Sequence, residues 1–185
     1  RNIFSCDSGD PPPATSKKLK DAIGGLQVTM AESMAIFAPN ANSYRRFTPG
    51  SYAPVNTAWG HNHRSVSLRI PPSNNCNTRI EHRSAGADAN PYLVMSAILA
   101  GIHHGIINEL NPDKMIHSGQ CYDPPIGKLP NTWEKAITSL ERNSILRNYF
   151  PGNYLDYFLI VKRSEYNRFQ SEVSDRDYAW YLKLA

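Results

Sequence analysis

The sequence has few cysteines, and they are not arranged as a disulfide framework. Only Cys6, Cys76 and Cys121 occur among 185 residues, and none belongs to a Cys-x-x-Cys motif. An odd number at such wide spacing is typical of reduced thiols in a cytoplasmic protein. We expect none of the three to act as a nucleophile.

Long apolar runs and basic tracts are also missing. No apolar stretch reaches the roughly 20 residues that span a bilayer, and His103 and His104 interrupt the most apolar segment, 91–107. Lysine and arginine exceed aspartate and glutamate by 20 to 16, but they are spread along the chain without a basic run interleaved with aromatics. We therefore predict that the protein binds neither membrane nor nucleic acid.

The chain begins Arg1-Asn2-Ile3, without an initiator methionine and without a signal-peptide pattern. Its length is sufficient for about one domain with a hydrophobic core. We interpret it as part of a longer polypeptide and expect the fragment alone to be catalytically incomplete.

The first predicted helix runs from about residue 14 to 37, after a proline run. Gly24-Gly25 is expected to bend or break it, giving one kinked helix or two consecutive ones. Its apolar residues recur at three- and four-residue steps, which is typical of a core-facing stripe: Leu19, Ile23, Leu26, Met30, Met34 and Phe37.

Strands are predicted at about 55–60, 65–70 and 78–83, after a loop at 40–58. Asn90-Pro91 opens a helix to about 108, with asparagine as N-cap and proline at the first position. A loop at 111–131 precedes helical patterns, with four aromatic packing anchors, at 132–140, 144–149, 153–172 and 175–184: Trp133, Phe158, Phe169 and Trp180. Strands followed by helices predict an α+β fold, with an antiparallel sheet covered by helices on one face.

Charged side chains gather on two of these strands. Side chains alternate along a strand, so Arg79, Glu81 and Arg83 share one face, opposite Ile80 and His82. The 65–70 strand adds Arg69 on its polar face, whereas Arg64 has the apolar parity, so it lies at the strand start, at a bulge or elsewhere. Such a cluster suits phosphate and metal, although a solvated row of charges is the simpler alternative.

These residues resemble the C-terminal part of the glutamine synthetase catalytic domain. The likeness is carried by Asn42-Ser43-Tyr44-Arg45-Arg46, Pro49-Gly50, Ala53-Pro54-Val55, Arg64-Ser65, Arg69-Ile70-Pro71, Arg79-Ile80-Glu81, Arg83 and Ala89-Asn90-Pro91-Tyr92-Leu93. Residues 58–64 and 86–91 look most similar to the γ-glutamylputrescine or γ-glutamyl-polyamine synthetase branch.

The resemblance implies a glutamine synthetase/guanido kinase-like domain, of which 1–185 is the C-terminal part and 132–185 a helical C-terminal region. An upstream catalytic segment and an N-terminal β-grasp domain would be absent. The implied reaction phosphorylates the γ-carboxylate of L-glutamate with ATP and Mg²⁺ or Mn²⁺, and a putrescine-like amine or ammonia then attacks the acyl phosphate. The implied parent is a cytoplasmic homo-oligomeric ring, a decamer or dodecamer.

The family motifs imply different roles for the arginines of this chain. Arg64 and Arg79 look like nucleotide-phosphate contacts, Arg46 and Arg83 like contacts to glutamate and the acyl phosphate, and Arg69 like a cofactor contact or a structural ion pair. Glu81 looks like a metal ligand; its alternative is an ion pair with Arg79 or Arg83.

The loop Pro49-Gly50-Ser51-Tyr52-Ala53-Pro54 departs from the family pattern. Ammonia-using members have a glutamate where Tyr52 stands, and a phenol with an ordinary pKa near 10 is a poor anionic site for ammonium. An aromatic face can instead attract an alkylammonium group, by about 0.5–2 kcal/mol. Our hypothesis is that Tyr52 and the 59–63 region admit a larger amine.

Two other functions remain open: ordinary glutamine synthesis with a divergent loop, and a structural relative without catalysis. His61 and His63 are expected to be structural or to contact substrate, because the nearby arginines disfavour a metal there. His82 is expected to be a packed, hydrogen-bonded histidine, and His103 and His104 to be structural.

Overall fold

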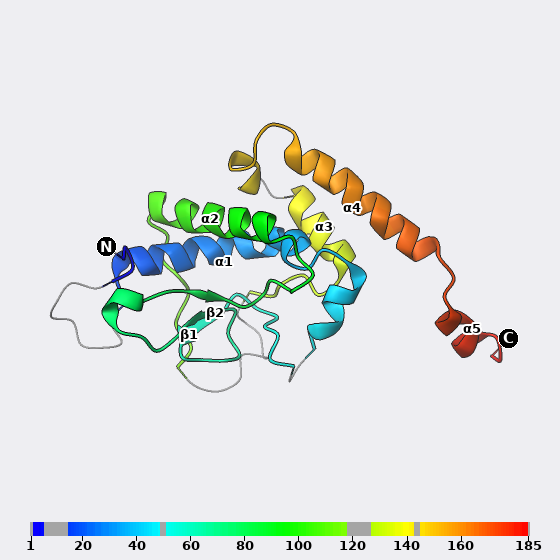
Figure 1. Cartoon of the computed structure of the whole chain (residues 1–185), viewed down its shortest axis with the longest axis horizontal. Helices are drawn as coiled ribbons and strands as arrows, with labels where there is room; N and C mark the ends of the chain where they lie inside the picture. The colour runs from blue at the N-terminus through cyan, green and yellow to red at the C-terminus, as the bar shows by residue number, and fades with distance from the viewer. Residues whose placement is uncertain (1, 6–14, 49–50, 118–126, 143–144, 185) are drawn as a thin grey trace.

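The computed structural model describes residues 2–5, 15–48, 51–117, 127–142 and 145–184. Cys6, Cys121, Pro49 and Gly50, which entered the predictions above, lie outside these residues. Helices α1, α2 and α3 lie together on one side of a small sheet, and α4 and α5 extend away from them as an arm (Figure 1). The α+β class predicted from the sequence is confirmed.

Helix α1, Lys17–Phe37, is the central element of the core. Ser16 caps it by accepting a hydrogen bond from the backbone N–H of Leu19, and the predicted apolar stripe is fully buried. The helix continues through its glycine pair, so the alternative of two consecutive helices is wrong. A Cβ on Gly25 would overlap the backbone of Gly101 and Gly105 in α2, so the glycine permits a close helix crossing instead.

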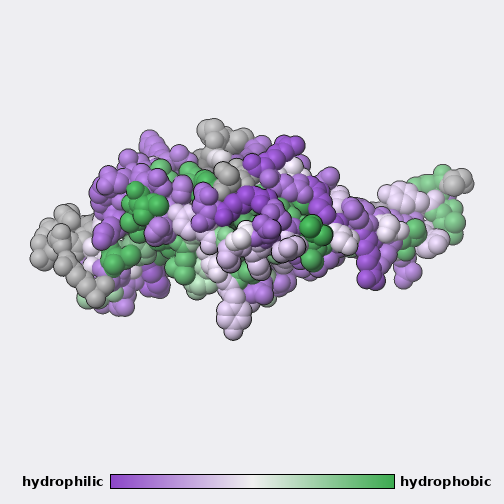
Figure 2. Space-filling model, turned by 90° about the horizontal axis from the view of Figure 1, so that it is seen from above, coloured by the Kyte–Doolittle hydropathy of each residue, from purple (hydrophilic) through white to green (hydrophobic). Residues whose placement is uncertain are grey.

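Helix α2, Pro91–Ile107, begins as predicted. The side chain of Asn90 accepts hydrogen bonds from the N–H groups of Tyr92 and Leu93, and Pro91 needs no partner at the first position. One side of α2 packs on α1, while the other exposes apolar side chains to solvent, visible as green surface in Figure 2. The exposed apolar residues are Met95, Leu99 and Ile107, and the ring of Tyr92 at the start of the helix is also exposed.

The sheet has the order β1-β2-β3, with strands Trp59–His61, Leu68–Ile70 and Glu81–His82. Strands β2 and β3 are antiparallel, but β1 and β2 are parallel, so the expectation of an antiparallel sheet is wrong for that pair. Residues 62–67 do not form a tight hairpin; they return the chain so that the N–H groups of Ser67 and Leu68 meet the carbonyl of Ala58. The strands are also shorter than predicted.

The C-terminal helices are α3, Trp133–Arg142, α4, Tyr154–Ser171, and α5, Asp175–Tyr181. The helical pattern predicted at 144–149 is the short 3₁₀ turn Leu146–Asn148, and another such turn spans Asn75–Asn77. Of the predicted anchors, Trp133 is buried and Phe158 packs against the core. Phe169 and Trp180 are 49% and 60% exposed, because the end of α4 and all of α5 project beyond the core (Figure 1).

No helix in the described part of the chain is both long enough and apolar enough to span a bilayer.

Glu32 is a carboxylate buried in the core. It lies on α1 and is only 1% exposed. Burial raises the pKa of Glu32 from 4.5 to about 7, although the backbone N–H of Leu146 opposes the shift. The folded state therefore retains a proton between these two pH values that the unfolded chain has lost, and stability must fall as pH rises from about 4.5 to about 7.

Replacing Glu32 with Gln should remove this pH-dependent loss. We expect the thermal midpoint of Glu32→Gln to match that of the wild type near pH 4.5 and to exceed it by roughly 5–10 °C at pH 8. Circular dichroism melts from pH 4.5 to 8 measure this difference. Glu134→Gln, at an exposed position on α3, should leave the pH profile unchanged. Parallel profiles for wild type and Glu32→Gln would show that Glu32 does not titrate as described.

Candidate functional site

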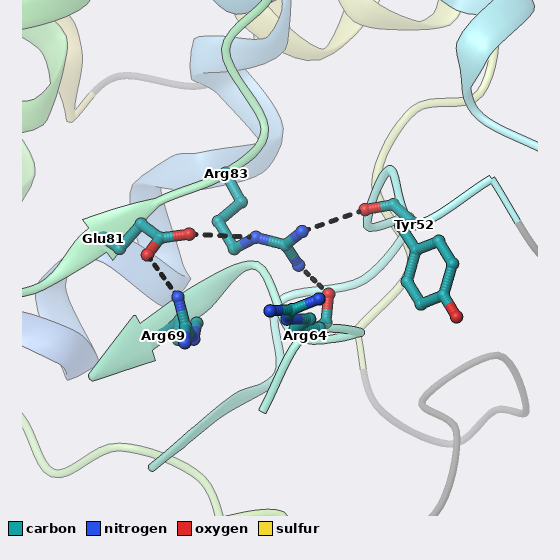
Figure 3. A pocket seen from close by; sticks show the side chains of 5 residues that line it. All are labelled: Tyr52, Arg64, Arg69, Glu81 and Arg83. Carbon is teal, nitrogen blue, oxygen red and sulfur yellow. Dashed lines mark hydrogen bonds and ion pairs between the residues drawn. The ribbon is translucent and has the colours of Figure 1, made fainter. Parts of the chain in front are cut away.

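A pocket of about 350 Å³ lies where the sequence predicted the charged cluster. It is lined by side chains from the loop before β1, the turn after it, β2 and the β3 region (Figure 3): Tyr52, Arg64, Arg69, Glu81 and Arg83. Three guanidinium groups and one carboxylate give this pocket a net positive charge, which suits a polyanion such as phosphate.

Glu81 is the carboxylate at the centre of the cluster. Its Oε2 accepts a hydrogen bond from Nη1 of Arg69 at 2.8 Å, and its Oε1 lies 3.2 Å from Nε of Arg83. Arg69 and Glu81 are direct partners in the antiparallel register of β2 and β3. The predicted grouping of Arg69, Glu81 and Arg83 is therefore confirmed, while their roles in binding remain predictions.

Arg83, which directly follows β3, forms hydrogen bonds with two loops. Its Nη1 donates to the carbonyl oxygens of Arg64 and Val66, the second at 3.2 Å, and its Nη2 donates to that of Tyr52 at 3.3 Å. Most of its N–H groups are thus engaged within the chain. Arg83 shapes the pocket by fixing the backbone at both sides of it.

Arg64 differs from the other two arginines. Its backbone carbonyl holds Arg83, but within the described residues its exposed guanidinium has no hydrogen bond or ion pair. Of the three pocket arginines, it therefore has the most donors free for a ligand. The parity that made Arg64 ambiguous in the sequence is explained by its position in the turn between β1 and β2.

Tyr52 has a left-handed backbone, with φ of 57°, and its side chain is 62% exposed. Its carbonyl faces Arg83, whereas its ring points away from the ion pairs (Figure 3). A left-handed backbone is uncommon for a bulky residue and carries strain of order 1–3 kcal/mol. The loop therefore presents an aromatic ring at the rim of the pocket.

Two predicted site residues lie outside this pocket. Arg79 is exposed, and its Nη1 donates to the carbonyl of Asn77 at 3.2 Å. Strand β3 contains only residues 81 and 82, so the alternation that was expected to align Arg79 with Glu81 does not extend to it. Arg46 ends the 3₁₀ helix η1, Ala41–Arg46, where its guanidinium donates to the carbonyl of Ser84.

The histidines make local contacts. His61 Nε2 lies 3.0 Å from the hydroxyl of Thr15, and His63 Nδ1 lies 3.1 Å from that of Ser65. His82 packs against Phe37, and burial lowers the pKa of its imidazole to about 4. Its packing is as predicted, but the expected hydrogen bond is absent: within the described residues, neither ring nitrogen has a partner.

No group of three or more His, Cys, Asp or Glu side chains gathers among the described residues. Divalent ions such as Mg²⁺ take several oxygen ligands, often including substrate phosphates. Glu81 is thus suited to supply one oxygen to a metal whose other ligands come from a nucleotide or from elsewhere in the protein.

Sequence reasoning missed Asn62, which orients Arg69. Its Oδ1 accepts a hydrogen bond from Nη2 of Arg69 at 2.7 Å, and its φ is 49°. Asparagine tolerates this left-handed conformation better than most residues, which was the only local signal of a special position. Asn62 and Glu81 together fix the Arg69 guanidinium from two sides.

Comparison with known proteins places these residues in a family context. A family model described as "Glutamine synthetase, catalytic domain" matches residues 1–181. The γ-glutamylputrescine synthetase of Escherichia coli is 39% identical over 184 residues, which cover 100% of this chain and 38% of that protein. A glutamate–isopropylamine ligase of a Pseudomonas species is 32% identical over 175 residues, covering 94% and 38%. The chain thus spans about two fifths of these relatives.

Two solved structures of GmaS share the fold of this chain. GmaS without ligand superposes with a TM-score of 0.84 at 27% identity, over 98% of this chain and 41% of that one. A complex of GmaS with ADP gives the same TM-score and identity over 99% and 43%.

The charge balance of the pocket can be tested with a simple polyanion. Replacing Glu81 with Gln removes the negative charge between Arg69 and Arg83. We expect Glu81→Gln to bind inorganic pyrophosphate about tenfold more tightly in metal-free buffer, as measured by isothermal titration calorimetry. Glu141→Gln is the matched control, because Glu141 also pairs with an arginine, Arg163, outside this pocket. Equal affinity of Glu81→Gln and wild type would show that the cluster is not an anion site.

Proposed function

The chain belongs to the glutamine synthetase catalytic-domain family, and on this premise we propose that the whole protein joins an amine to the γ-carboxyl group of L-glutamate with ATP. The observation that carries the proposal is the pocket in which Arg64, Arg69 and Arg83 surround Glu81. Relatives named for putrescine and isopropylamine support an organic amine as the acceptor.

The proposed reaction has two steps. A γ-carboxylate oxygen of glutamate attacks the terminal phosphorus of ATP, and the bond to ADP breaks. The amine nitrogen then attacks the acyl carbon, inorganic phosphate leaves, and the nitrogen loses a proton. Both steps move negative charge between oxygen atoms, which fixed guanidinium groups can stabilise without reorganising.

The pocket arginines suit different parts of this reaction. Arg64, whose guanidinium has no partner among the described residues, is proposed to bind a nucleotide phosphate, a role also proposed for the exposed Arg79. Arg69 and Arg83 are held by Glu81 and are proposed to contact the nucleotide and the acyl phosphate, respectively. Arg46 is proposed to bind the carboxylate of glutamate.

Glu81 is proposed as a metal ligand. Mg²⁺ or Mn²⁺, when bound, would neutralise phosphate charge, and Glu81 supplies the one carboxylate among the described residues that line the pocket, a hard oxygen ligand of the type that these ions prefer. Its ion pairs with Arg69 and Arg83 must loosen for it to take this role. Those pairs orient the carboxylate in the free protein.

Other proposals for the whole protein rest on the family alone. They are a homo-oligomeric ring, a decamer or dodecamer, and a cytoplasmic location. The alternative functions are ammonia-using glutamine synthesis, since glutamine synthetases are also among the relatives, and a scaffold without catalysis.

The first test is phosphate release by the full-length protein with ATP, Mg²⁺ and L-glutamate. Ammonium, putrescine, spermidine and monoamines are compared, and reactions without glutamate give the background. We expect kcat/KM for an organic amine to exceed that for ammonium by at least about tenfold, because the resemblance implies that Tyr52 stands where ammonia-using members have a glutamate. A preference for ammonium would identify a glutamine synthetase, and no turnover with any amine would favour the scaffold.

Tyr52 is the residue on which the amine preference should depend. We expect Tyr52→Glu to raise the ratio of kcat/KM for ammonium to that for putrescine by about tenfold or more, because it exchanges an aromatic face for a negative charge. Tyr52→Phe keeps the ring and should change the ratio less than about threefold. Neither Glu nor Phe is β-branched, so the left-handed backbone at this position should strain the two variants to a similar extent. An unchanged ratio in Tyr52→Glu would rule out a role in amine selection.

A further inference from the structure

We propose that Asp88 is a positioning residue that holds the guanidinium of Arg46 in place for the carboxylate substrate. The inference rests on the proposed function, in which Arg46 contacts glutamate. It concerns a cluster outside the pocket described above, made by η1 and the segment 84–90 that leads into α2.

The carboxylate of Asp88 forms hydrogen bonds with two residues at the beginning of η1. Its Oδ2 accepts hydrogen bonds from the hydroxyl of Ser43 at 2.6 Å and from Nδ2 of Asn40 at 3.0 Å. Asn40 is the N-cap of η1, and Ser43 completes a capping box with it. Asp88 therefore fixes the helical turn that ends at Arg46, from a segment more than 40 residues further along the chain.

The guanidinium of Arg46 lies beside the same carboxylate. It donates to the carbonyl of Ser84 and lies 4.3 Å above the ring of Phe47. A Cβ on Gly86 would come within 2.5 Å of Asp88 Oδ1 and 3.4 Å of Arg46 Nη2. Both charged groups thus approach the position that a Cβ on residue 86 would occupy, and a larger residue there would have to displace the carboxylate of Asp88.

Asp88 acts on Arg46 through charge, not through a hydrogen bond. Burial lowers the pKa of Arg46, and the charge of Asp88 opposes this shift. Burial raises the pKa of Asp88, but its hydrogen bonds with Ser43 and Asn40 and the charge of Arg46 outweigh it and hold the pKa below its usual value. Both groups therefore stay ionised at neutral pH.

This arrangement leaves donors of Arg46 available. A bidentate ion pair with Asp88 would occupy the guanidinium edge that recognises a carboxylate. Here the described residues show one hydrogen bond of the guanidinium, from Nη2 to Ser84, so Nη1 has no partner among them, while Nε is buried and also without one. The negative charge of Asp88 compensates the positive charge of Arg46 without occupying its N–H groups. A substrate carboxylate can therefore still bind to those groups.

The competing explanation is that Asp88 only stabilises η1. Asp88→Asn separates the two roles, because the amide keeps an oxygen that accepts from Ser43 but removes the charge beside Arg46. Asp156→Asn is the matched control: its carboxylate pairs with an arginine, Arg147, at 2.5 Å, in a different part of the fold.

Two measurements on the full-length protein test the proposal. The first is the rate at which p-hydroxyphenylglyoxal modifies Arg46, followed by peptide mass spectrometry, which does not depend on catalysis. The second is KM for L-glutamate beside KM for ATP. For Asp88→Asn we expect faster modification of Arg46, a KM for glutamate raised about tenfold, an unchanged KM for ATP and a thermal midpoint within about 2 °C of wild type.

A double-mutant cycle gives the decisive comparison. If Asp88 acts through Arg46, Asp88→Asn should add less than about twofold to the KM for glutamate in an Arg46→Lys background. Unchanged modification of Arg46, or effects that simply multiply in the double variant, would overturn the proposal. Faster modification with an unchanged KM for glutamate would overturn the link to the substrate. An inactive wild type would refute the proposed function, and with it that link, while the modification rate would still decide whether Asp88 holds Arg46.

Discussion

The pairing of Arg69 with Glu81 across β2 and β3 is the interaction on which the site depends. The antiparallel register sets these two residues opposite each other, and a shift by one residue would send one of them to the other face of the sheet. Glu81 then orients Arg83, which binds the carbonyl groups on both flanking loops. One ion pair between two short strands thus determines the positions of the loops that carry Arg64 and Tyr52.

Strands this short need support from the helices behind them. Leu68 and Ile70 of β2 point into the core formed around α1, on the side opposite Arg69. Helix α2 can pack directly on α1 because Gly25 and Gly105 bring the two backbones into contact, where a side chain would collide. The segment from β3 to α2 is then held between this helix pair and η1, which is where Asp88 and Arg46 meet.

The sequence predicted those features that depend on local chemistry. Alternation along β2 and β3 brought Arg69, Glu81 and Arg83 together, and Asn90-Pro91 marked the start of α2 correctly. Features that depend on where the chain turns were not predictable in this way. Arg79 falls outside the site because β3 begins at Glu81, and β1 runs parallel to β2 because residues 62–67 form a loop instead of a hairpin.

The roles proposed for the arginines differ because these side chains differ in how many of their donors the described part of the protein uses. Arg83 directs its N–H groups to a carboxylate and to backbone carbonyls. Its loss would therefore change the shape of the pocket, in addition to any ligand contact that it makes. Arg64 has no guanidinium partner among the described residues, so it can respond to a ligand without disturbing their contacts. Arg46 lies between these cases, with one carbonyl partner and a neighbouring negative charge that leaves donors open. A charged partner that acts at a distance compensates a cation without occupying its donors, and Asp88 does so because its hydrogen bonds are directed to Ser43 and Asn40.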